Sequence, residues 1–386
     1  MRTQTDLSRA LISARERTDD LFRIVRPDSL YERPIPERHR IIFYLGHLEA
    51  FDWNLIGRYH LDLRSFQPEF DHLFAFGIDP PAGELPSDRP SDWPGFLEVE
   101  RYNQRIRDEI DDLLEEVPEQ LLHVAIEHRL MHAETFAYIV HNLPFARKIG
   151  QSAPPVQSSP RKTAPFIPIP AGSARLGRTA EEGFGWDNEF EAHTVDVPAF
   201  SIARYKVTNG EYLEFVRGGA PPPFFWNERG GRYYYRGMFS ETPLPLECPV
   251  YVTYQEAEAY ARWRGKRLQT EPEFHRAACI PPSSGNFDFR HWDPLPVTAD
   301  EIPSSDSPAQ MWSNGWEWTS TPFQPFPGFQ AFPFYANYSE PFFDGDHYVL
   351  KGASPRTAAC FRRTSFRNWF RPSYPYLYAT FRLVES

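Results

Sequence analysis

The segment Leu121-Leu-His-Val-Ala-Ile-Glu-His-Arg-Leu-Met-His-Ala-Glu-Thr-Phe-Ala-Tyr-Ile139 sets the fold class of the N-terminal part of the chain. Residues at alternating steps of three and four positions form one stripe, which includes Leu121, His128, His132 and Ile139. This spacing is typical of the buried face of a helix in a bundle. Two imidazoles one turn apart are therefore expected to face the core, where a polar ring needs a partner.

Two kinds of partner suit this pair of buried imidazoles. A transition metal is one, because imidazole nitrogens bind iron, zinc and copper. A backbone carbonyl or a carboxylate is the other. The spacing alone leaves both interpretations open, since histidines four residues apart are common.

The same helical periodicity extends over the first 150 residues. It predicts helices over residues 6–25, 37–57, 95–117 and 118–142. Four amphipathic helices of this length predict a four-helix bundle over residues 1–150, in which metal ligands project from facing helices. Phe43, His47 and Phe51 share one stripe of the second helix. His47 is therefore the third candidate ligand.

The pattern changes after a connector rich in proline and serine, residues 151–165, which cannot hold a helix. Residues 193–202 alternate like half-buried strands, and residues 253–264 keep a helical stripe. Long aromatic stretches with little periodicity fill the rest. Residues 166–386 are therefore expected to form an irregular α+β domain whose loops carry function. The predicted fold class of the whole chain is α plus α+β.

Composition excludes several classes of partner. The formal net charge of −11 argues against binding to nucleic acid or to an anionic membrane surface. No apolar run is long enough to span a bilayer, and the first residues lack the apolar core of a signal peptide. Three scattered cysteines, Cys248, Cys279 and Cys360, are typical of a reduced protein, so we expect a cytoplasmic location.

The C-terminal half carries several motifs in a fixed order. These are the segment from Cys248 to Ala278, Asn314-Gly-Trp-Glu-Trp-Thr-Ser320, Val349-Leu-Lys-Gly-Ala-Ser354 and Thr380-Phe-Arg-Leu383. Together they resemble the formylglycine-generating-enzyme (sulfatase-modifying-factor) family, and the resemblance implies a C-type-lectin-like α+β domain over residues 166–386. The copper-binding cysteine pair of those enzymes is not apparent, so their chemistry is not expected here.

The N-terminal half resembles the DinB-type four-helix bundle. Fused in this order, the two halves look like the ergothioneine-type sulfoxide synthases and the related selenoneine synthases. Those are mononuclear non-haem iron enzymes that use O2 to join a sulfur or selenium donor to the imidazole of Nα-trimethylhistidine (hercynine). The resemblance implies Fe(II) held by three histidines.

Two of the family's ligands lie in an H-x3-H-x-E motif. His128, His132 and Glu134 match this motif, and His47 matches the ligand from the earlier helix. Glu134 lies ~200° around an ideal helix from His132. We therefore interpret it as a supporting residue and not as a ligand.

The resemblance also assigns residues of the C-terminal half. Tyr335 is similar to the family's proton-donating tyrosine and Tyr338 to a residue that lines the hercynine pocket, although the neighbouring aromatics leave a one-position slip open. Asn368 and Trp369 match residues that position hercynine. The structural alternative for this pair is a strand end with an Asn turn and a core Trp.

Three positions depart from the relatives that take γ-glutamylcysteine. Phe370 and Tyr374 stand where those enzymes have an Asp and an Arg, and Met131 stands where they have a Gln that contacts hercynine. A glutamyl group needs charged partners. The expected donor is therefore cysteine or a selenosugar, with Arg367 and Arg371 as possible contacts for anionic or hydroxyl groups.

These observations predict an iron(II), O2-dependent enzyme that forms a C–S or C–Se bond on hercynine. Because pockets favour domain interfaces, we expect its site between the bundle and the aromatic loops. The rival interpretation is a zinc-binding or non-catalytic DinB-like module joined to a carbohydrate-binding-like domain.

Overall fold

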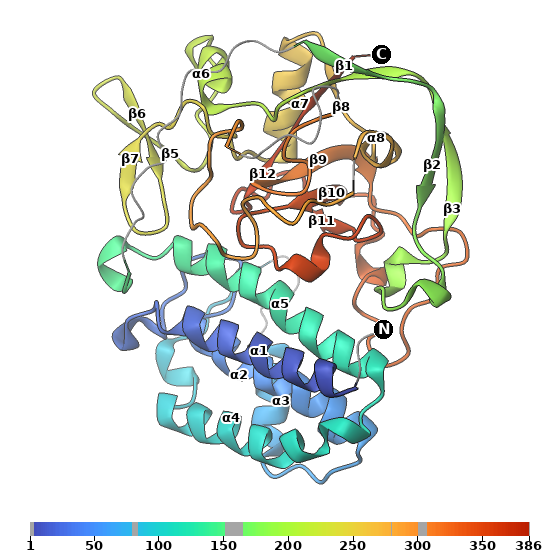
Figure 1. Cartoon of the computed structure of the whole chain (residues 1–386). Helices are drawn as coiled ribbons and strands as arrows, with labels where there is room; N and C mark the ends of the chain where they lie inside the picture. The colour runs from blue at the N-terminus through green and yellow to red at the C-terminus, as the bar shows by residue number, and fades with distance from the viewer. Residues whose placement is uncertain (1–3, 79–83, 151–164, 279, 300–306, 386) are drawn as a thin grey trace. The chain divides into compact units, whose positions relative to one another are not determined.

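The computed structural model of the protein describes residues 4–78, 84–150, 165–278, 280–299 and 307–385. The chain divides into two compact units, residues 1–151 and 152–386, which we call unit 1 and unit 2 (Figure 1). Apart from residue 165, the predicted connector lies outside the described residues. None of the helices in the described part of the chain has the length and apolar character that a membrane crossing requires.

Unit 1 is helical, as predicted. Its four long helices coincide with the four predicted segments, and a π-helical stretch, η2 (Trp53–His60), directly continues the second of them. A fifth, shorter helix, α3 (Pro68–Phe76), was not predicted. The four long helices are α1 (Gln4–Phe22), α2 (Ile41–Asp52), α4 (Phe96–Ile110) and α5 (Glu119–His141).

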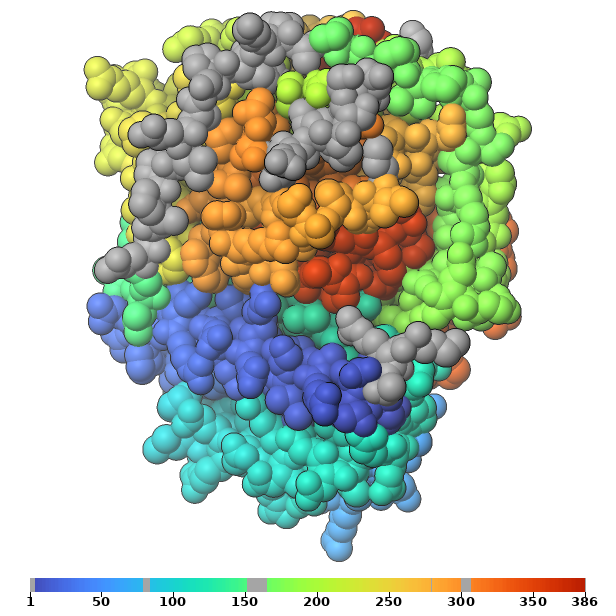
Figure 2. Space-filling model, viewed as in Figure 1, coloured from blue at the N-terminus to red at the C-terminus, as the bar shows by residue number. Residues whose placement is uncertain are grey.

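Helix α5 buries the stripe that the sequence indicated. Leu121, Ala125, His128 and Ile139 are all at most 5% exposed. The helix begins after Pro118, which cannot donate a backbone hydrogen bond and so suits this position. Helix α5 packs against α1 and α2. On the face of unit 1 seen in Figure 2, α1 (dark blue) lies beside the cyan surface of α4 and of η4 (Asp111–Glu116), a 3-10 turn.

Unit 2 is built from short strands joined by long loops. One sheet has the order β1-β4-β13-β8 and a second has the order β11-β10-β9-β12. A two-stranded ribbon, β2-β3, and a three-stranded sheet, β5-β6-β7, complete the set among the described residues. The strands of the two larger sheets are β1 (Phe166–Ile169), β4 (Phe200–Ala203), β8 (Arg267–Leu268), β9 (Gly315–Pro322), β10 (Tyr348–Ala353), β11 (Asn368–Phe370), β12 (Ala379–Thr380) and β13 (Leu383–Glu385).

The smaller sheets and the helices of unit 2 follow local sequence rules. The strands predicted over residues 193–202 are confirmed as β3 (His193–Val197) and β4, and the helix predicted over residues 253–264 is confirmed as α7 (Tyr254–Trp263). Thr253 caps α7 by accepting from the Glu256 N–H at 3.2 Å, and Glu256 accepts from the Thr253 N–H at 2.7 Å. The remaining elements are β2 (Gly172–Leu176), β5 (Trp226–Arg229), β6 (Arg232–Arg236), β7 (Glu241–Pro243), α6 (Asn209–Arg217), α7 (Tyr254–Trp263) and α8 (Glu271–Ala277).

Candidate functional site

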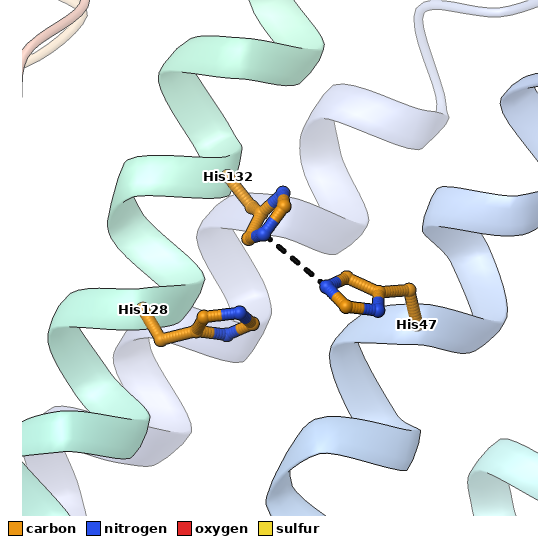
Figure 3. A group of neighbouring side chains, drawn as sticks. All are labelled: His47, His128 and His132. Carbon is orange, nitrogen blue, oxygen red and sulfur yellow. Dashed lines mark hydrogen bonds between the residues drawn. The ribbon is translucent and has the colours of Figure 1, made fainter. Parts of the chain in front are cut away.

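The three predicted ligands of unit 1 meet at one point. Figure 3 shows the rings of His128 and His132, one turn apart on α5, facing His47 on α2. One nitrogen of each ring lies within 4.8 Å of the other two. The Nε2 atoms of His47 and His132 are 3.2 Å apart. Among the described residues, this is the group of three or more His, Cys, Asp or Glu side chains whose geometry suits a metal ion.

The hydrogen bond made by His47 identifies its free nitrogen. Its Nδ1 lies 2.7 Å from the carbonyl oxygen of Phe74, which can only accept, so Nδ1 carries the proton and Nε2 has the lone pair. That lone pair points at Nε2 of His132. Two imidazole nitrogens bound to one ion at ~2.1 Å are ~3.0–3.4 Å apart, so this pair already has the separation that a shared metal requires. Nδ1 of His132 is buried and has no hydrogen-bond partner among the described residues.

Burial keeps these histidines neutral. Burial lowers the pKa of His47 to about 4. The hydrogen bond from the ring to the Phe74 carbonyl raises this pKa, but its effect is smaller than that of burial. Burial, followed by the neighbouring imidazoles and Arg129, lowers the pKa of His128 well below its usual range. Burial, His47 and Arg38 do the same for His132. A metal ligand must be deprotonated, so three neutral imidazoles could accept a cation at neutral pH without first releasing protons.

Aromatic side chains fix the imidazole rings. Phe51 stacks on His128 with ring centroids 3.4 Å apart, and Phe43 stacks on His47 at 4.8 Å. The Tyr44 ring lies 6.2 Å from that of His132. Stacked rings cannot turn freely, so Phe51 and Phe43 hold the imidazoles of His128 and His47 in place before any ion binds. The predicted stripe of Phe43, His47 and Phe51 therefore supports the cluster.

Glu134 and Met131, on α5 beside the ligands, are both half-buried. Glu134 is not part of the cluster of three side chains, and its interpretation as a supporting residue stays a prediction. A hercynine contact at the Met131 position stays a prediction.

A buried network of charges lies next to the ligands, and the sequence did not indicate it. Arg129, adjacent to His128 and 1% exposed, donates to Asp52 at 2.7 Å and pairs with Glu49 at 3.0 Å. Both acids lie on α2, within five residues of His47. Arg15 of α1 approaches the same two carboxylates at 3.5 and 3.8 Å.

The fourth long helix joins the network through Arg107 of α4. Its guanidinium contacts Glu49 at 2.6 Å and Asp19 of α1 at 2.9 Å. Burial opposes the ionisation of Glu49, but Arg129, Arg15 and Arg107 outweigh it and lower the pKa of Glu49 to about 2. Burial raises the pKa of Asp52 despite two nearby arginines. All four long helices are thus tied together by charges beside the histidine cluster.

In unit 2, the predicted tyrosines and the predicted tryptophan come together. Tyr338 is 8% exposed, and its ring lies 5.3 Å from that of Trp369 at an interplanar angle of 81°. The Tyr335 ring lies 5.6 Å from that of Tyr338. Trp186, which the sequence did not single out, stacks on Tyr338 at 4.0 Å and lies 6.3 Å from Tyr335. The four rings form one aromatic cluster.

The neighbours of Trp369 in β11 are arranged differently. Asn368 and Phe370 alternate with Trp369 along the strand, so they face the other side of it. The Asn368 side chain accepts from the Trp369 N–H at 3.0 Å. Phe370 stacks on Tyr374, with ring centroids 5.4 Å apart. An aromatic pair therefore occupies the two positions at which the relatives that take γ-glutamylcysteine have an Asp and an Arg. A substrate contact by Asn368 or Phe370 stays a prediction.

The two arginines of this region have different surroundings. Arg367 is 2% exposed, and its guanidinium donates to Glu271 at 3.1 Å and to the Gln324 carbonyl at 3.0 Å. These bonds give Arg367 a structural role in the fold. The Arg371 side chain is 66% exposed, and its Nε lies 3.9 Å from Asp346. Contacts of either residue with a substrate stay predictions.

Sequence reasoning missed the turn η7 (Asp187–Glu189), which follows Trp186. Its three polar side chains are at most 1% exposed. Asp187 accepts from the Ser339 hydroxyl at 2.5 Å, and Glu189 accepts from Ser365 at 2.6 Å and from Arg363. A run of three polar residues in a non-periodic segment normally indicates a solvated loop. The flanking aromatics Trp186 and Phe190 were the available signal that this turn is buried.

Known proteins resemble the chain over most of its length. The family model of the sulfatase-modifying factor enzyme 1-like domain matches residues 152–293, which confirms the resemblance predicted for the C-terminal part. The chain is 31% identical to hercynine oxygenase of Mycolicibacterium thermoresistibile, over 99% of this chain and 95% of that one. It is 37% identical to hercynine oxygenase of Mycobacterium tuberculosis, over 53% of this chain and 57% of that one. Ergothioneine biosynthesis protein 1 of Schizosaccharomyces pombe is 28% identical over 94% of this chain, which spans 54% of that relative.

Proposed function

Because this chain belongs to the family of the hercynine oxygenases, we propose that it is an oxygenase that acts on hercynine, with Fe(II) as its cofactor and O2 as its oxidant. The observation that carries the proposal is the cluster of His47, His128 and His132, whose facing nitrogens lie within 4.8 Å. Three neutral imidazoles suit a divalent transition metal and leave coordination positions for other ligands. When bound there, Fe(II) supplies the redox chemistry that a reaction with O2 requires.

For a thiol donor, the proposed reaction balances as a four-electron oxidation by O2. The imidazole C–H bond and the S–H bond break, and a C–S bond and an S=O bond form. One oxygen atom of O2 enters the sulfoxide, and the other leaves as water with the two hydrogens. With a selenol donor, the imidazole C–H bond and the Se–H bond break, a C–Se bond and an Se=O bond form, and the second oxygen atom again leaves as water with the two hydrogens.

Tyr335 is suited to hold a proton for this reaction. Burial, and then the carboxylate of Asp187, raise the pKa of Tyr335 to about 12. The phenol is therefore protonated at neutral pH and can donate, as a general acid must. We assign Tyr335 this role, with Tyr338 and Trp369 as aromatic surfaces for hercynine. A trimethylammonium group cannot accept or donate hydrogen bonds, and aromatic faces attract it by cation–π interaction.

The donor is proposed to be cysteine or a selenosugar. The stacked pair of Phe370 and Tyr374 offers no charge to a glutamyl carboxylate or ammonium. A flat aromatic surface can stack on the ring of a selenosugar. Cysteine, a small amino acid, would instead bind elsewhere in the site.

The test uses the full chain, purified and loaded with Fe(II) without O2. Hercynine is supplied with cysteine, γ-glutamylcysteine or a selenosugar, and O2 consumption and product mass are followed. We expect O2 uptake that requires hercynine, and a product that contains hercynine joined to the donor. The rival interpretation, a zinc-binding or non-catalytic module, predicts bound zinc or no metal and no product with any donor. Failure of every donor with fully iron-loaded protein would overturn the proposal.

A further inference from the structure

The buried turn η7 holds the segment that carries both tyrosines. Ser339 ends this segment, and its hydroxyl donates to Oδ1 of Asp187 at 2.5 Å. The same hydroxyl accepts from the Asn188 side-chain amide at 2.9 Å. Since a hydroxyl has one proton and two lone pairs, these two bonds fix its orientation. Ser339 is fully buried, so water does not compete for either bond.

Asp187 also accepts a hydrogen bond from the other end of the tyrosine segment, at Phe332. The backbone N–H of Phe332 donates to its carboxylate. Between the two anchors, the Tyr335 N–H bonds to the Phe332 carbonyl at 3.0 Å and the Tyr338 N–H to the Tyr335 carbonyl at 3.1 Å. Residues 332–339 therefore form consecutive turns whose two ends are tied to one carboxylate.

The residue before Asp187 contributes to the same arrangement. Trp186 is fully buried and stacks on Tyr338 at 4.0 Å. Glu189, two residues after Asp187, holds the segment that leads to Asn368 and Trp369, because it accepts from Ser365 and Arg363. One short turn thus orients the tyrosine segment with one acid and the approach to β11 with the other.

We propose that Asp187 is a positioning residue for Tyr335 and Tyr338: its carboxylate fixes residues 332–339 at Phe332 and Ser339, and so sets where the two phenol groups lie. This inference rests on the proposed function, which assigns the tyrosines their roles. Oδ2 of Asp187 is buried and has no hydrogen-bond partner among the described residues. The fold thus keeps a buried carboxylate that is only half satisfied, which costs stability and needs a compensating role.

Other groups around Asp187 have separate partners. Glu189 is the nearest carboxylate and adds negative charge, but it is paired with Arg363. Tyr335, on the opposite segment, is near enough for the charge of Asp187 to raise the pKa of its phenol. Replacing Asp187 therefore acts mainly on the tyrosine segment.

The experiment compares Asp187→Ala, Ser339→Ala and the double variant with the wild-type enzyme. Each is loaded with Fe(II) and given hercynine and its best donor, and the ratio of coupled product to O2 consumed is measured together with kcat. A displaced Tyr335 should divert O2 to oxidation of the donor, as Tyr335→Phe should. We expect kcat to fall at least ~10-fold in each single variant, with a lower coupling ratio, because a hydrogen bond to a charged group is worth about that factor.

Three comparisons make the result specific. The double variant should be no worse than the more damaging single variant, because both changes break one bond. Asp187→Asn should recover part of the coupling ratio, because its amide oxygen can still accept from Ser339. Asp196→Ala is the matched control, since Asp196 accepts from Ser173 at 3.4 Å on the exposed β2–β3 ribbon and should leave both quantities unchanged.

The outcomes separate the two proposals. If the wild-type enzyme couples hercynine but Asp187→Ala and Ser339→Ala keep the wild-type kcat and coupling ratio, the positioning role is overturned and the proposed function stands. If the wild-type enzyme makes no product with any donor, the proposed function itself fails. Ser339→Ala removes a single oxygen, so it gives a result even where Asp187→Ala does not fold.

Discussion

The preparation of His47 for metal binding depends on a single hydrogen bond. Its Nδ1–H is held by the Phe74 carbonyl, so Nε2 is the atom left to bind a metal. Outer partners of this kind set the tautomer and the ring orientation of a metal ligand. His132 completes the facing pair at 3.2 Å. Removing either ring removes one proposed ligand without changing the helix that carries it.

The first prediction concerns His132. His132→Ala should abolish Fe(II) binding while the far-ultraviolet circular dichroism spectrum stays that of the wild type, because alanine favours the helix. His123→Ala is the control, since His123 lies on the same helix outside the cluster and should leave iron binding intact. Iron content of the two purified variants decides between them. Stoichiometric iron in His132→Ala would contradict the assignment.

Asp187 makes the stability of unit 2 depend on pH. Burial raises the pKa of Asp187 to about 6, from an unfolded value near ~4. The folded state then binds more protons than the unfolded state between these values, so the contribution of Asp187 to stability falls as pH rises through this window. Above pH 6 the cost reaches up to ~3 kcal/mol.

The second prediction follows from that sign. Asp187→Asn removes the ionisation, so its free energy of unfolding relative to the wild type should increase between pH 4 and pH 7. Chemical denaturation of both proteins at several pH values measures this difference. The hydrogen bonds that the substitution changes shift the difference by a constant, so only its slope is at issue. A flat difference would show that folding does not raise the pKa of Asp187.

At the scale of secondary-structure elements, the charge network explains how α2 and α5 keep their register. Arg129 follows His128 in the chain and binds both acids of α2. A slip of either helix would separate these charges inside the protein, where unpaired charges are costly. The same contacts therefore hold His47 opposite the histidines of α5.

The third prediction is that Arg129→Met destabilises unit 1 by ~3–5 kcal/mol, because Glu49 and Asp52 lose a buried partner. It should also weaken Fe(II) binding, since the ligands no longer have a fixed separation. Arg23→Met is the control, because the Arg23 side chain is 75% exposed and its pair with Asp20 contributes little. Equal stability of the two variants in denaturant titrations would show that the network is dispensable.

Phe370, at the end of β11, and the nearby Tyr374 allow the proposed choice of sulfur or selenium donor to be tested. The double variant Phe370→Asp with Tyr374→Arg replaces the aromatic stack by the two charges that the γ-glutamylcysteine enzymes carry. We predict that it raises kcat/KM for γ-glutamylcysteine relative to cysteine by at least ~10-fold, the value of one charged hydrogen bond. The ratio of kcat/KM for the two donors is the measurement. A wild type that already prefers γ-glutamylcysteine would refute the donor assignment.

Elements with strong periodicity were predictable, and irregular ones were not. The stripe through His128 and His132 located α5 within two residues at each end. The short helix α3 and the π-helical stretch η2 follow no long apolar repeat, so periodicity could not predict them. Turn η7 was missed because Asp187 and Glu189 are buried against hydrogen-bond partners that lie more than 150 residues away in the sequence. Such partners depend on tertiary structure and leave no local pattern.

The histidine cluster was accessible to prediction for the same reason. Its spacing on α5 gave two residues, and the stripe on α2 gave the third. The sequence shows which residues of the network are charged, namely Arg15, Glu49, Asp52 and Arg129. It does not show that they are buried, because a charged residue is normally solvated. Their burial depends on how four helices pack, which periodicity alone does not specify.

At the scale of the whole molecule, the histidine cluster lies in one compact unit and the aromatic cluster in the other. Unit 1 is held by helix packing and buried charges, whereas unit 2 is held by short sheets and long loops. A metal that binds the native cluster stabilises the unit that contains it.

The fifth prediction tests this difference by metal removal. At a free Fe(II) concentration of ~100 times Kd, binding adds ~2.7 kcal/mol to the opening of unit 1, so its slowest amides should exchange ~100-fold more slowly than after chelation. We expect the effect in α2 and α5 and not in β9 and β10. Hydrogen exchange followed by mass spectrometry resolves these segments. Unchanged exchange in α5 on chelation would argue against a metal there.

The buried turn at η7 also matters to anyone who wishes to engineer this protein. Libraries that alter substrate range usually randomise loops, because loop side chains face water and tolerate change. Asp187, Asn188 and Glu189 lie outside any strand or α-helix, yet they are 1%, 1% and 0% exposed. A library that treats these positions as loop would lose most of its members to misfolding. They should be kept fixed, and diversity placed at exposed positions such as Arg371.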